Sequence, residues 1–428
     1  MIAATMDLIV HQLDVTTAFL NGTLEEEVFM KGPEGFEKAG KAHMVCKLKK
    51  SLYGLKQAPR VWFQVFSSDL KGLGFSLVEG VECLFVKFIG EDVIYVMAYV
   101  DDFLLISNTA RLIIWVKEEL FKLYKLKDMG EVTSFLGVDI QRDRKTRKTF
   151  LSQKSYIEEV LNRFGMETCK AVKTPAVTKP CKRTSTPCDD KTPFREAVGS
   201  LLYLSTRTRP DIAAAVGAVA RHVERPSESD WTDLKRILRY LKGTLNFCLI
   251  LGPGAHGSPA LKGYSDADWA GDTEDRKSVS GYIIQVFNST ISWKSIKQTA
   301  VALSTAEAEY IALAEAAKQV VWLRRILEQL GYTQKSPTTI HEDNQSCIAW
   351  VYDDGSTKRA KHIDLKYHYS KDMAAKGEIK VEYCPTADMI ADIMTKPLGR
   401  NRFEALRFAT GVRNPEEEED SKIAAATF

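Results

Sequence analysis

The sequence predicts a multidomain protein of mixed structure, in which an α+β part is followed by an α/β part. Its 428 residues, 45% of them hydrophobic, suffice for two or three separate cores. Short β-rich runs and helical patterns are mixed in residues 1–165, and strand and helix signals alternate again in residues 259–398. Residues 194–249 between them are mostly helical in pattern. This order of elements indicates several layered domains of α and β structure.

The first part contains an expected hairpin and an expected helix. Residues 93–98 and 103–106 are rich in β-branched and aromatic residues and flank a polar dipeptide, which predicts a hairpin. Apolar residues at helical spacing predict a helix over residues 112–124. Four prolines among lysine, threonine, serine and aspartate then predict a linker over residues 169–193.

Further helices and strands follow the linker. Arg209-Pro210-Asp211 is expected to open one helix, and Ser229-Asp230-Trp231 to cap the start of another. Residues 281–287 and 291–293 predict paired strands, and good helix formers predict a long helix over residues 305–330. The acidic run at residues 416–420 predicts a disordered tail.

The composition argues against several classes of protein. The net charge is only +3, so any basic surface must be local. The eight cysteines contain no C-x-x-C pair, which argues against a zinc ribbon and against a disulfide framework. The longest apolar run, residues 93–106, is short and interrupted by two aspartates, so no membrane partner is expected. One expected helix has a basic face that fits either phosphate contact or an ordinary amphipathic helix: Lys235, Arg236, Arg239 and Lys242.

Two adjacent carboxylates, Asp101 and Asp102, lie at the tip of the expected hairpin. Like charges held together cost free energy, and a purely structural hairpin would favour Asn-Gly or Asp-Gly there, although an exposed turn remains an alternative. A divalent cation removes that cost, because Mg²⁺ prefers carboxylate and phosphate oxygens. Asp14, flanked by Leu13 and Val15 as strand residues would flank it, supplies a third acid. Carboxylates from two neighbouring strands can hold the two metal ions that a polymerase needs.

The surrounding segments resemble those of reverse transcriptases. YVDD at residues 99–102 resembles the active-site turn, LDVTTAF at residues 13–19 resembles the other metal-binding strand, and FLGVDI at residues 135–140 resembles the primer grip. The resemblance implies Asp14, Asp101 and Asp102 as catalytic metal ligands. It also implies that Phe19 excludes a ribose 2′-hydroxyl, and that Gln57, in SLYGLKQAPR, and Tyr99 belong to the nucleotide site.

A second set of acids lies in the last third of the chain. Asp266 follows an apolar-to-polar switch, Asp343 follows a short strand, Glu309 lies near the start of the long helix, and Asp392 lies on an expected C-terminal helix. Four acids from separate elements are what two-metal phosphodiester hydrolysis requires. Glu307 remains an alternative to Glu309, and a capping or solvated role is favoured for the remaining nearby acids, Asp268 and Asp272.

These acids occur in segments that resemble ribonuclease H of the Ty1/copia class of LTR retrotransposons. YSDADWAGD, DRKSVSGY, ALSTAEAEYIAL, DNQS, KHIDLKYH and ADIMTKPL follow one another as in that class, as do TAFLNG, EEEVFM, PEGF and CKLKKSLYGLKQAPR earlier in the chain. The chain is thus similar to a Pol polyprotein fragment. The resemblance implies Asp266, Glu309, Asp343 and Asp392 as catalytic metal ligands, with two Mg²⁺ ions per active site and Mn²⁺ as a substitute. It implies as partners an RNA template, a DNA primer, an RNA–DNA hybrid and deoxynucleoside triphosphates.

The implied fold is a reverse transcriptase palm with incomplete fingers over residues 1–165, a linker and thumb or connection region over 166–258, a ribonuclease H-like α/β domain over 259–400 and a tail over 401–428. Only thirteen residues precede Asp14, where the family has a long fingers segment. A truncated relic that only binds nucleic acid, or that keeps only ribonuclease H activity, is therefore the alternative. The resemblance implies a cytoplasmic virus-like particle as the location and leaves the oligomeric state open.

Overall fold

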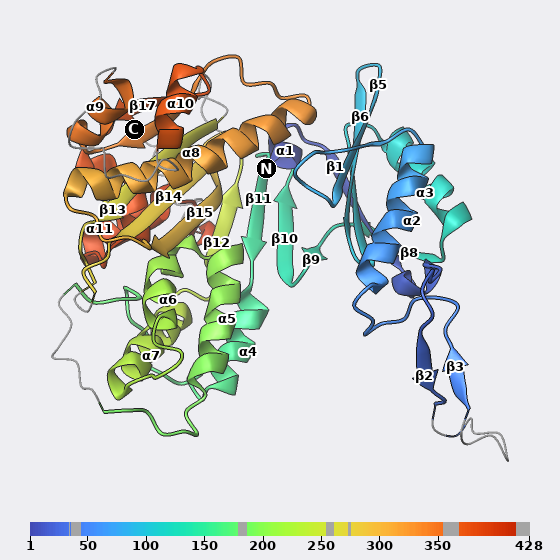
Figure 1. The fold of residues 1–428 in the computed structure, drawn as a ribbon, viewed down its shortest axis with the longest axis horizontal. Helices are drawn as coiled ribbons and strands as arrows, with labels where there is room; N and C mark the ends of the chain where they lie inside the picture. Colours follow the sequence, from blue (N-terminus) through green and yellow to red (C-terminus); the bar gives the residue numbers. More distant parts are fainter. Residues whose placement is uncertain are drawn as a thin grey trace. The chain divides into compact units, whose positions relative to one another are not determined.

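The structure, a computed structural model, describes residues 1–33, 35, 44–178, 186–253, 261–272, 275–353 and 368–416. The chain divides into two compact units. The first unit consists of Met6–Val132 with Ile2, and the second begins at Thr133 and includes Met1 and Ala3–Thr5. Both units combine helices with sheets, as the sequence predicts (Figure 1). No helix in the described part of the chain is long and apolar enough to cross a membrane.

The first unit is built on a six-stranded antiparallel sheet of order β4-β5-β6-β7-β1-β8. Its strands are β1 (Ile9–Val15), β4 (Ser76–Leu77), β5 (Leu84–Ile89), β6 (Asp92–Tyr99), β7 (Asp102–Ser107) and β8 (Leu126–Glu131). A separate ribbon pairs β2 (Phe29–Lys31) with β3 (Val45–Lys47). The helices are α2 (Ala58–Gly72), α3 (Ala110–Leu123) and the short 3-10 helix η1 (Ala18–Asn21). The predicted hairpin and helix of this part are confirmed as β6–β7 and α3.

Helices α2 and α3 pack on the same face of this sheet (Figure 1). Trp62 and Phe66 of α2 and Val116 of α3 share one core with Leu13 of β1 and Phe103 of β7. These side chains are almost fully buried, and burying each large apolar side chain contributes about 1.5–3 kcal/mol. The core therefore holds β1 and β7 side by side inside the sheet, and these are the strands that carry Asp14 and Asp102.

The second unit contains two sheets. One is antiparallel, of order β18-β12-β11-β10-β9, and consists of β9 (Ser134–Phe135), β10 (Val138–Asp143), β11 (Lys148–Ser152), β12 (Cys248–Leu251) and β18 (Val412–Arg413). The other is mixed, of order β15-β14-β13-β16-β17, and consists of β13 (Leu261–Asp268), β14 (Val279–Val286), β15 (Ser289–Lys297), β16 (Thr338–Glu342) and β17 (Ile379–Tyr383). In the mixed sheet β13 pairs antiparallel with β14 and parallel with β16.

Helices surround these sheets. They are α1 (Ile2–Thr5), α4 (Lys154–Arg163), α5 (Phe194–Arg207), α6 (Ala213–Ala220), α7 (Glu228–Lys242), α8 (Thr305–Gln329), α9 (Gln345–Tyr352), α10 (Tyr369–Ala375) and α11 (Arg400–Ala409), with the short 3-10 helices η2 (Pro210–Ile212), η5 (Thr386–Asp388) and η6 (Ile390–Met394). The predicted long helix is confirmed as α8, and the predicted strand pair as β14–β15.

The mixed sheet is covered on both faces. A Cβ atom at Gly263 of β13 would point toward α8, 3.4 Å from Val320. Gly263 pairs with Ile284, and Gly281 is three residues from Ile284, so Gly281 faces the opposite side. A Cβ atom there would lie 2.5 Å from the Cβ of Met394 and 2.7 Å from the Cγ2 of Thr395. Only glycine at position 281 lets η6 approach the sheet this closely.

The start of α7 differs from the prediction. The N-cap is Ser227, not the segment Ser229-Asp230-Trp231. The Ser227 hydroxyl accepts the backbone N–H of Asp230, and the Asp230 carboxylate accepts the backbone N–H of Ser227. The helix begins earlier than expected because this reciprocal capping box satisfies two backbone donors at once.

Two predicted boundaries also differ from the structure. Residues 401–413 were assigned to the C-terminal tail, but they lie in α11 and β18, because Phe403 and Leu406 are buried in the core of the second unit. Residues 417–428 lie outside the described residues. The compact units divide between Val132 and Thr133 rather than near residue 165, because β10 and β11 belong to the same sheet as β12.

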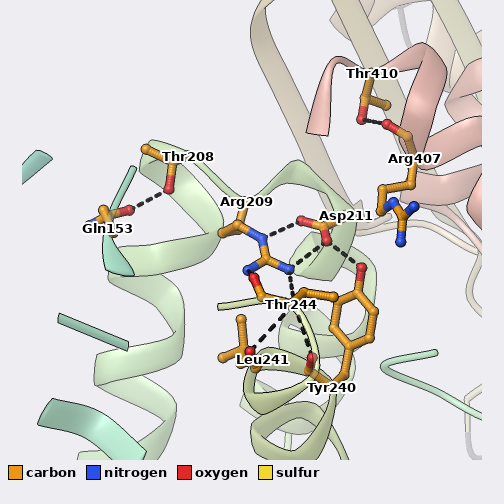
Figure 2. Close-up of polar contacts among 9 residues, drawn as sticks. All are labelled: Gln153, Thr208, Arg209, Asp211, Tyr240, Leu241, Thr244, Arg407 and Thr410. Atoms are coloured by element: carbon orange, nitrogen blue, oxygen red, sulfur yellow. Dashed lines mark hydrogen bonds and ion pairs between the residues drawn. The ribbon is translucent and has the colours of Figure 1, made fainter. Parts of the chain in front are cut away.

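A buried polar network lies between η2 and α7 (Figure 2). Arg209 donates two hydrogen bonds to the Asp211 carboxylate, at 2.9 and 2.8 Å, and a third to the Thr244 hydroxyl at 2.8 Å. The Tyr240 hydroxyl donates to the same carboxylate at 2.6 Å. The Arg209 and Asp211 side chains are at most 1% exposed. Each charge is thus held by the other, and removal of either would leave a buried charge unpaired.

We expect Asp211→Ala to lower the free energy of unfolding by about 3–5 kcal/mol, because Arg209 would remain buried without its partner. Urea unfolding of the full chain, followed by circular dichroism, measures this change. The matched control is Lys318→Ala, which breaks the exposed ion pair with Glu315 at 2.8 Å and should cost at most about 1 kcal/mol. If both variants lost the same free energy of unfolding, the larger effect expected from breaking the buried ion pair would be contradicted.

The same network predicts a response to acid. Burial opposes ionisation of Asp211, but the charge and hydrogen bonds of Arg209 and the Tyr240 hydroxyl outweigh it and lower the pKa of that carboxyl below its usual value. The stabilisation is therefore complete above about pH 4 and is lost as the pH falls through the lowered pKa. Unfolding midpoints between pH 6 and pH 2 should fall more steeply for the wild type than for Asp211→Asn, and parallel slopes would refute this assignment.

Candidate active sites

The first acid cluster, Asp14, Asp101 and Asp102, lies where β1 meets the β6–β7 turn. Asp14 is directly opposite Asp102 in the antiparallel register of β1 and β7. The backbone N–H of Val15 donates to the carbonyl of Asp101 at 2.7 Å, and the Gln12 amide donates to the Asp102 carboxylate at 3.1 Å. The expectation that two neighbouring strands bring these acids together therefore agrees with the register.

The turn that carries this cluster has a strained backbone. Val100 adopts a φ of 58°, a left-handed conformation that β-branched residues rarely adopt and that costs on the order of 1–3 kcal/mol. The indole N–H of buried Trp62 donates to the Val100 carbonyl at 2.6 Å. Trp62 itself is held by a near-parallel contact with the Phe103 ring at 6.4 Å and by Tyr124 at 5.1 Å. The apolar core thus stabilises the turn from beneath.

The resemblance implies three nucleotide-site residues: Phe19, Tyr99 and Gln57. Phe19 is buried, whereas Tyr99 is about half exposed. Gln57 precedes α2 and donates to the carboxylate of Glu26 at 3.3 Å. These positions leave the three nucleotide-site assignments as predictions.

An aromatic residue that sequence reasoning missed lies beside the first acid cluster. The ring of Tyr53 contacts that of Phe19, with 4.5 Å between centroids. Burial raises the pKa of the Tyr53 hydroxyl, and the charges of Asp101 and Asp14 raise it further. Tyr53 is about half exposed. It precedes Gln57 in the SLYGLKQAPR segment, so an aromatic residue in that motif was the available signal.

The second acid cluster consists of Asp266, Glu309 and Asp343. Each offers one carboxylate oxygen, and these oxygens all lie within 4.8 Å of one another. Asp266 belongs to β13, Glu309 to the first turns of α8, and Asp343 follows β16. Among the described residues, this is the one group of three or more potential metal ligands whose ligand atoms lie this close together. Asp14, Asp101 and Asp102 do not form such a group.

Asp392, the fourth predicted acid, lies on η6 beside this cluster and is already paired with two cations. Its carboxylate is 2.8 Å from the Lys396 ammonium and forms a close ion pair with Arg402. Lys396 also lies 3.6 Å from the Asp266 carboxylate, which accepts a hydrogen bond from the Thr395 hydroxyl. Lys396 thus bridges the carboxylates of Asp392 and Asp266, and Asp392 is not a member of the group of three.

Burial raises the pKa of two members of the second acid cluster, Asp266 and Glu309. It raises the pKa of Asp266 to about 7, where Lys396 opposes the rise and Asp392 adds to it. Burial raises the pKa of Glu309 well above its usual value, and the neighbouring charges of Glu342, Asp266 and Asp343 reinforce the effect. One carboxylate oxygen of Glu309 has no hydrogen-bond partner among the described residues. A divalent cation would supply the missing partner, and its preference for hard oxygen ligands fits this set.

Glu342 is a buried acid that sequence reasoning missed. It precedes Asp343 at the end of β16, is fully buried, and accepts the backbone N–H of Asn344 at 3.2 Å. Its other carboxylate oxygen has no hydrogen-bond partner in the part of the chain that the structure describes. Burial raises its pKa well above the usual value, and the charges of Asp343 and Asp266 add to this. The adjacent acids in IHEDNQS were the available signal.

The structure separates the roles of Glu307 and Glu309. The Glu307 carboxylate accepts the backbone N–H of Leu303 at 2.8 Å, and its own N–H donates to the Ser304 hydroxyl at 3.2 Å. These are capping contacts at the start of α8. Glu309, two residues later, points to Asp266 and Asp343. The geometry places Glu309 in the acid cluster and Glu307 in the cap of α8.

We expect Glu307→Gln and Glu309→Gln to change stability in opposite directions in metal-free buffer at pH 9. Glu307→Gln should lower the free energy of unfolding by about 1 kcal/mol, because the start of α8 loses a charged cap. Glu309→Gln should raise it, because the buried position loses a carboxyl that is repelled by its neighbours. Urea unfolding with a chelator present measures both, and a larger loss in Glu309→Gln than in Glu307→Gln would reverse the assignment.

A cavity of about 280 Å³ adjoins the second acid cluster. Its wall includes Lys396 and Asp268, Ala215 and Ala218 of α6, and Arg221 at the end of that helix. Asp272 pairs with Arg221 and Lys297, and its side chain is only 12% exposed, so the solvated or capping role that the sequence favours is wrong for this residue. The KHIDLKYH segment falls outside the described residues except for His368, whose Nδ1 lies 3.3 Å from the Tyr310 hydroxyl.

Known proteins resemble this chain along most of its length. Residues 1–178 match the family model described as reverse transcriptase (RNA-dependent DNA polymerase). The chain is 45% identical over 422 residues to the retrovirus-related Pol polyprotein from transposon TNT 1-94 of Nicotiana tabacum, across 96% of this chain and 32% of that protein. It is 34% identical over 311 residues to a putative transposon Ty5-1 protein of Saccharomyces cerevisiae, across 72% of this chain and 100% of that protein.

Among solved structures, an N-terminal ribonuclease H domain from Mycobacterium tuberculosis aligns with 35% of this chain and 98% of its own, at 15% identity. Its TM-score of 0.23 is too low to support a conclusion. The chain spans about a third of the length of the tobacco relative. The extent and identity of the two sequence matches show that the chain belongs to the Pol polyproteins of Ty1/copia-type retrotransposons.

Proposed function

We propose that the second acid cluster is a ribonuclease H active site that cleaves the RNA strand of an RNA–DNA hybrid. The observation that carries this proposal is the convergence of Asp266, Glu309 and Asp343, whose carboxylate oxygens lie within 4.8 Å of one another. Three separate elements supply these acids, and no structural need explains such a concentration of buried like charge. The unpartnered buried oxygen of Glu309 further supports a bound cation.

In this proposal Asp266, Glu309 and Asp343 hold one Mg²⁺ or Mn²⁺ ion, and Asp392 contributes to a second. Bound divalent ions would polarise the scissile phosphate and supply a nucleophilic water at neutral pH. The chain's own groups orient the ligands. The Thr395 hydroxyl donates to Asp266, and the Thr386 hydroxyl donates to Asp343 at 2.7 Å. Asp266 and Asp343 are thus each held by a neutral donor that leaves oxygen lone pairs free for a cation.

The first acid cluster is proposed as the polymerase site, with Asp14, Asp101 and Asp102 as the ligands of two further ions. Its substrates would be an RNA template, a DNA primer and deoxynucleoside triphosphates. The opposed positions of Asp14 and Asp102 support this assignment. We place Tyr53 beside Phe19 in the nucleotide site because it contacts that ring and lies near two of the aspartates.

A second candidate function is ribonuclease H activity without polymerase activity. It is favoured by the difference between the two clusters, since the acids of the first do not meet as closely as those of the second. If the side chains of a site must rearrange to bind a cation, the free energy of that rearrangement lowers the affinity for the cation. The two candidates differ in one observable, which is primer extension.

The test incubates the full chain with an RNA–DNA hybrid that carries a labelled RNA strand, together with a DNA primer, deoxynucleotides and Mg²⁺. We expect Mg²⁺-dependent RNA cleavage that Asp266→Asn with Asp343→Asn reduces by at least about a hundredfold. The matched control is Glu315→Gln, which changes a partly exposed acid on α8 and should leave cleavage unchanged. Cleavage that persists in the double variant would indicate a contaminating nuclease or a different site.

Extension of the primer in the same reaction separates the two candidates. Extension that Asp101→Asn with Asp102→Asn abolishes would support both activities. Cleavage without extension would favour the hydrolase alone. A folded protein that shows neither reaction with Mg²⁺ or Mn²⁺ would overturn the catalytic proposal.

A further inference from the structure

Lys396 occupies an unusual position between two of the proposed metal ligands. Its ammonium lies 2.8 Å from an Asp392 oxygen and 3.6 Å from an Asp266 oxygen. The backbone at this point is held in place, because the N–H of Lys396 donates to the Asp392 carbonyl at 3.3 Å and neighbouring Thr395 donates to Asp266. The long side chain of Lys396 can therefore move while its backbone stays.

The cation lies where it opposes a bound metal. A divalent ion coordinated by Asp266 and Asp392 would lie within a few ångströms of the Lys396 ammonium, and like charges at that separation repel strongly away from bulk water. Asp392 keeps a second cation, Arg402, when Lys396 leaves. Departure of Lys396 thus leaves Asp266 with the neutral Thr395 hydroxyl and without a paired cation, and it leaves Asp392 with Arg402.

The cavity next to the cluster offers the displaced ammonium a place. Lys396 lines this cavity of about 280 Å³, and Asp268 lies in the same wall. Asp268 belongs to β13, two residues beyond Asp266, and is partly exposed. A carboxylate therefore lies within the space into which Lys396 can turn. This gives a function to an acid for which the sequence favours only a solvated or capping role.

We propose that Lys396 is an internal competitor of the metal: it pairs with Asp266 and Asp392 in the metal-free protein and turns toward Asp268 when a divalent cation binds. The inference rests on the proposed ribonuclease H site. It differs from a purely structural ion pair in one respect. A structural pair would stabilise the ligands, so its loss would weaken cation binding, whereas loss of a competitor strengthens it.

The experiment measures Mn²⁺ binding by titration calorimetry in the full chain, without nucleic acid. All proteins carry Asp101→Asn and Asp102→Asn, so that the first acid cluster does not contribute. We expect Lys396→Met to bind Mn²⁺ on the order of tenfold more tightly than the parent, because a like charge has been removed. Lys396→Arg keeps the charge and should bind at or below the parent's affinity. Lys318→Met, an exposed lysine on α8, is the matched control and should leave binding unchanged.

Two further variants keep the inference testable if Lys396→Met does not fold. Asp268→Asn removes the alternative partner of Lys396 and should weaken Mn²⁺ binding several-fold, although Asp268 is outside the proposed ligand set. Asp266→Asn with Asp343→Asn should abolish the binding altogether. Unchanged or weaker binding in Lys396→Met, or unchanged binding in Asp268→Asn, would overturn the competition. Absence of binding in the parent, or its persistence in the Asp266–Asp343 double variant, would instead overturn the proposed site.

Discussion

Repulsion between buried carboxylates is the constraint on which the second unit depends. Asp266, Glu309, Glu342, Asp343 and Asp392 come from four segments of the chain, and all but Asp343 are nearly inaccessible to water. Such groups either bind a proton, pair with a cation or bind a metal. On the side of η6 the pairing is with Lys396 and Arg402. On the side of α8 and β16 no cation is paired with Glu309 or Glu342 among the described residues. The asymmetry places the strongest demand for a divalent cation on the side of Glu309 and Glu342.

The neighbouring helical region holds those cations in position. Tyr240, which completes the Arg209–Asp211 network, packs edge-to-face against Phe403 of α11, with 5.5 Å between ring centroids. Phe403 is adjacent in sequence to Arg402, which pairs with Asp392. The close approach of η6 to Gly281 fixes the other end of this arrangement. The buried network of Figure 2 therefore contributes to the geometry of the acids through packing, although none of its members belongs to the cluster.

The first unit also brings carboxylates close together, and there a strained backbone holds them in position. Asp101 and Asp102 are partly exposed, so water screens their repulsion and less compensation is needed. The cost falls instead on Val100, whose left-handed conformation is maintained by the hydrogen bond from Trp62 and by the aromatic core beneath it. Strain held by a rigid core is a common feature of sites that must present side chains at a fixed angle.

The sequence alone determined the type and place of the main elements, because hairpins, amphipathic helices and the long α8 are specified by local periodicity. It also pointed to candidate acids other than Glu342, since adjacent or strand-end carboxylates are costly without a ligand. Tertiary structure decided which acids meet. Glu307 and Glu309 lie on the same turn, and only packing of α8 shows that one caps the helix while the other reaches Asp266. The burial of Glu342, the contact of Tyr53 with Phe19 and the position of Lys396 between two carboxylates likewise arise from residues distant in sequence. Local patterns do not record such contacts, because a side chain's burial and its neighbours depend on how whole elements pack.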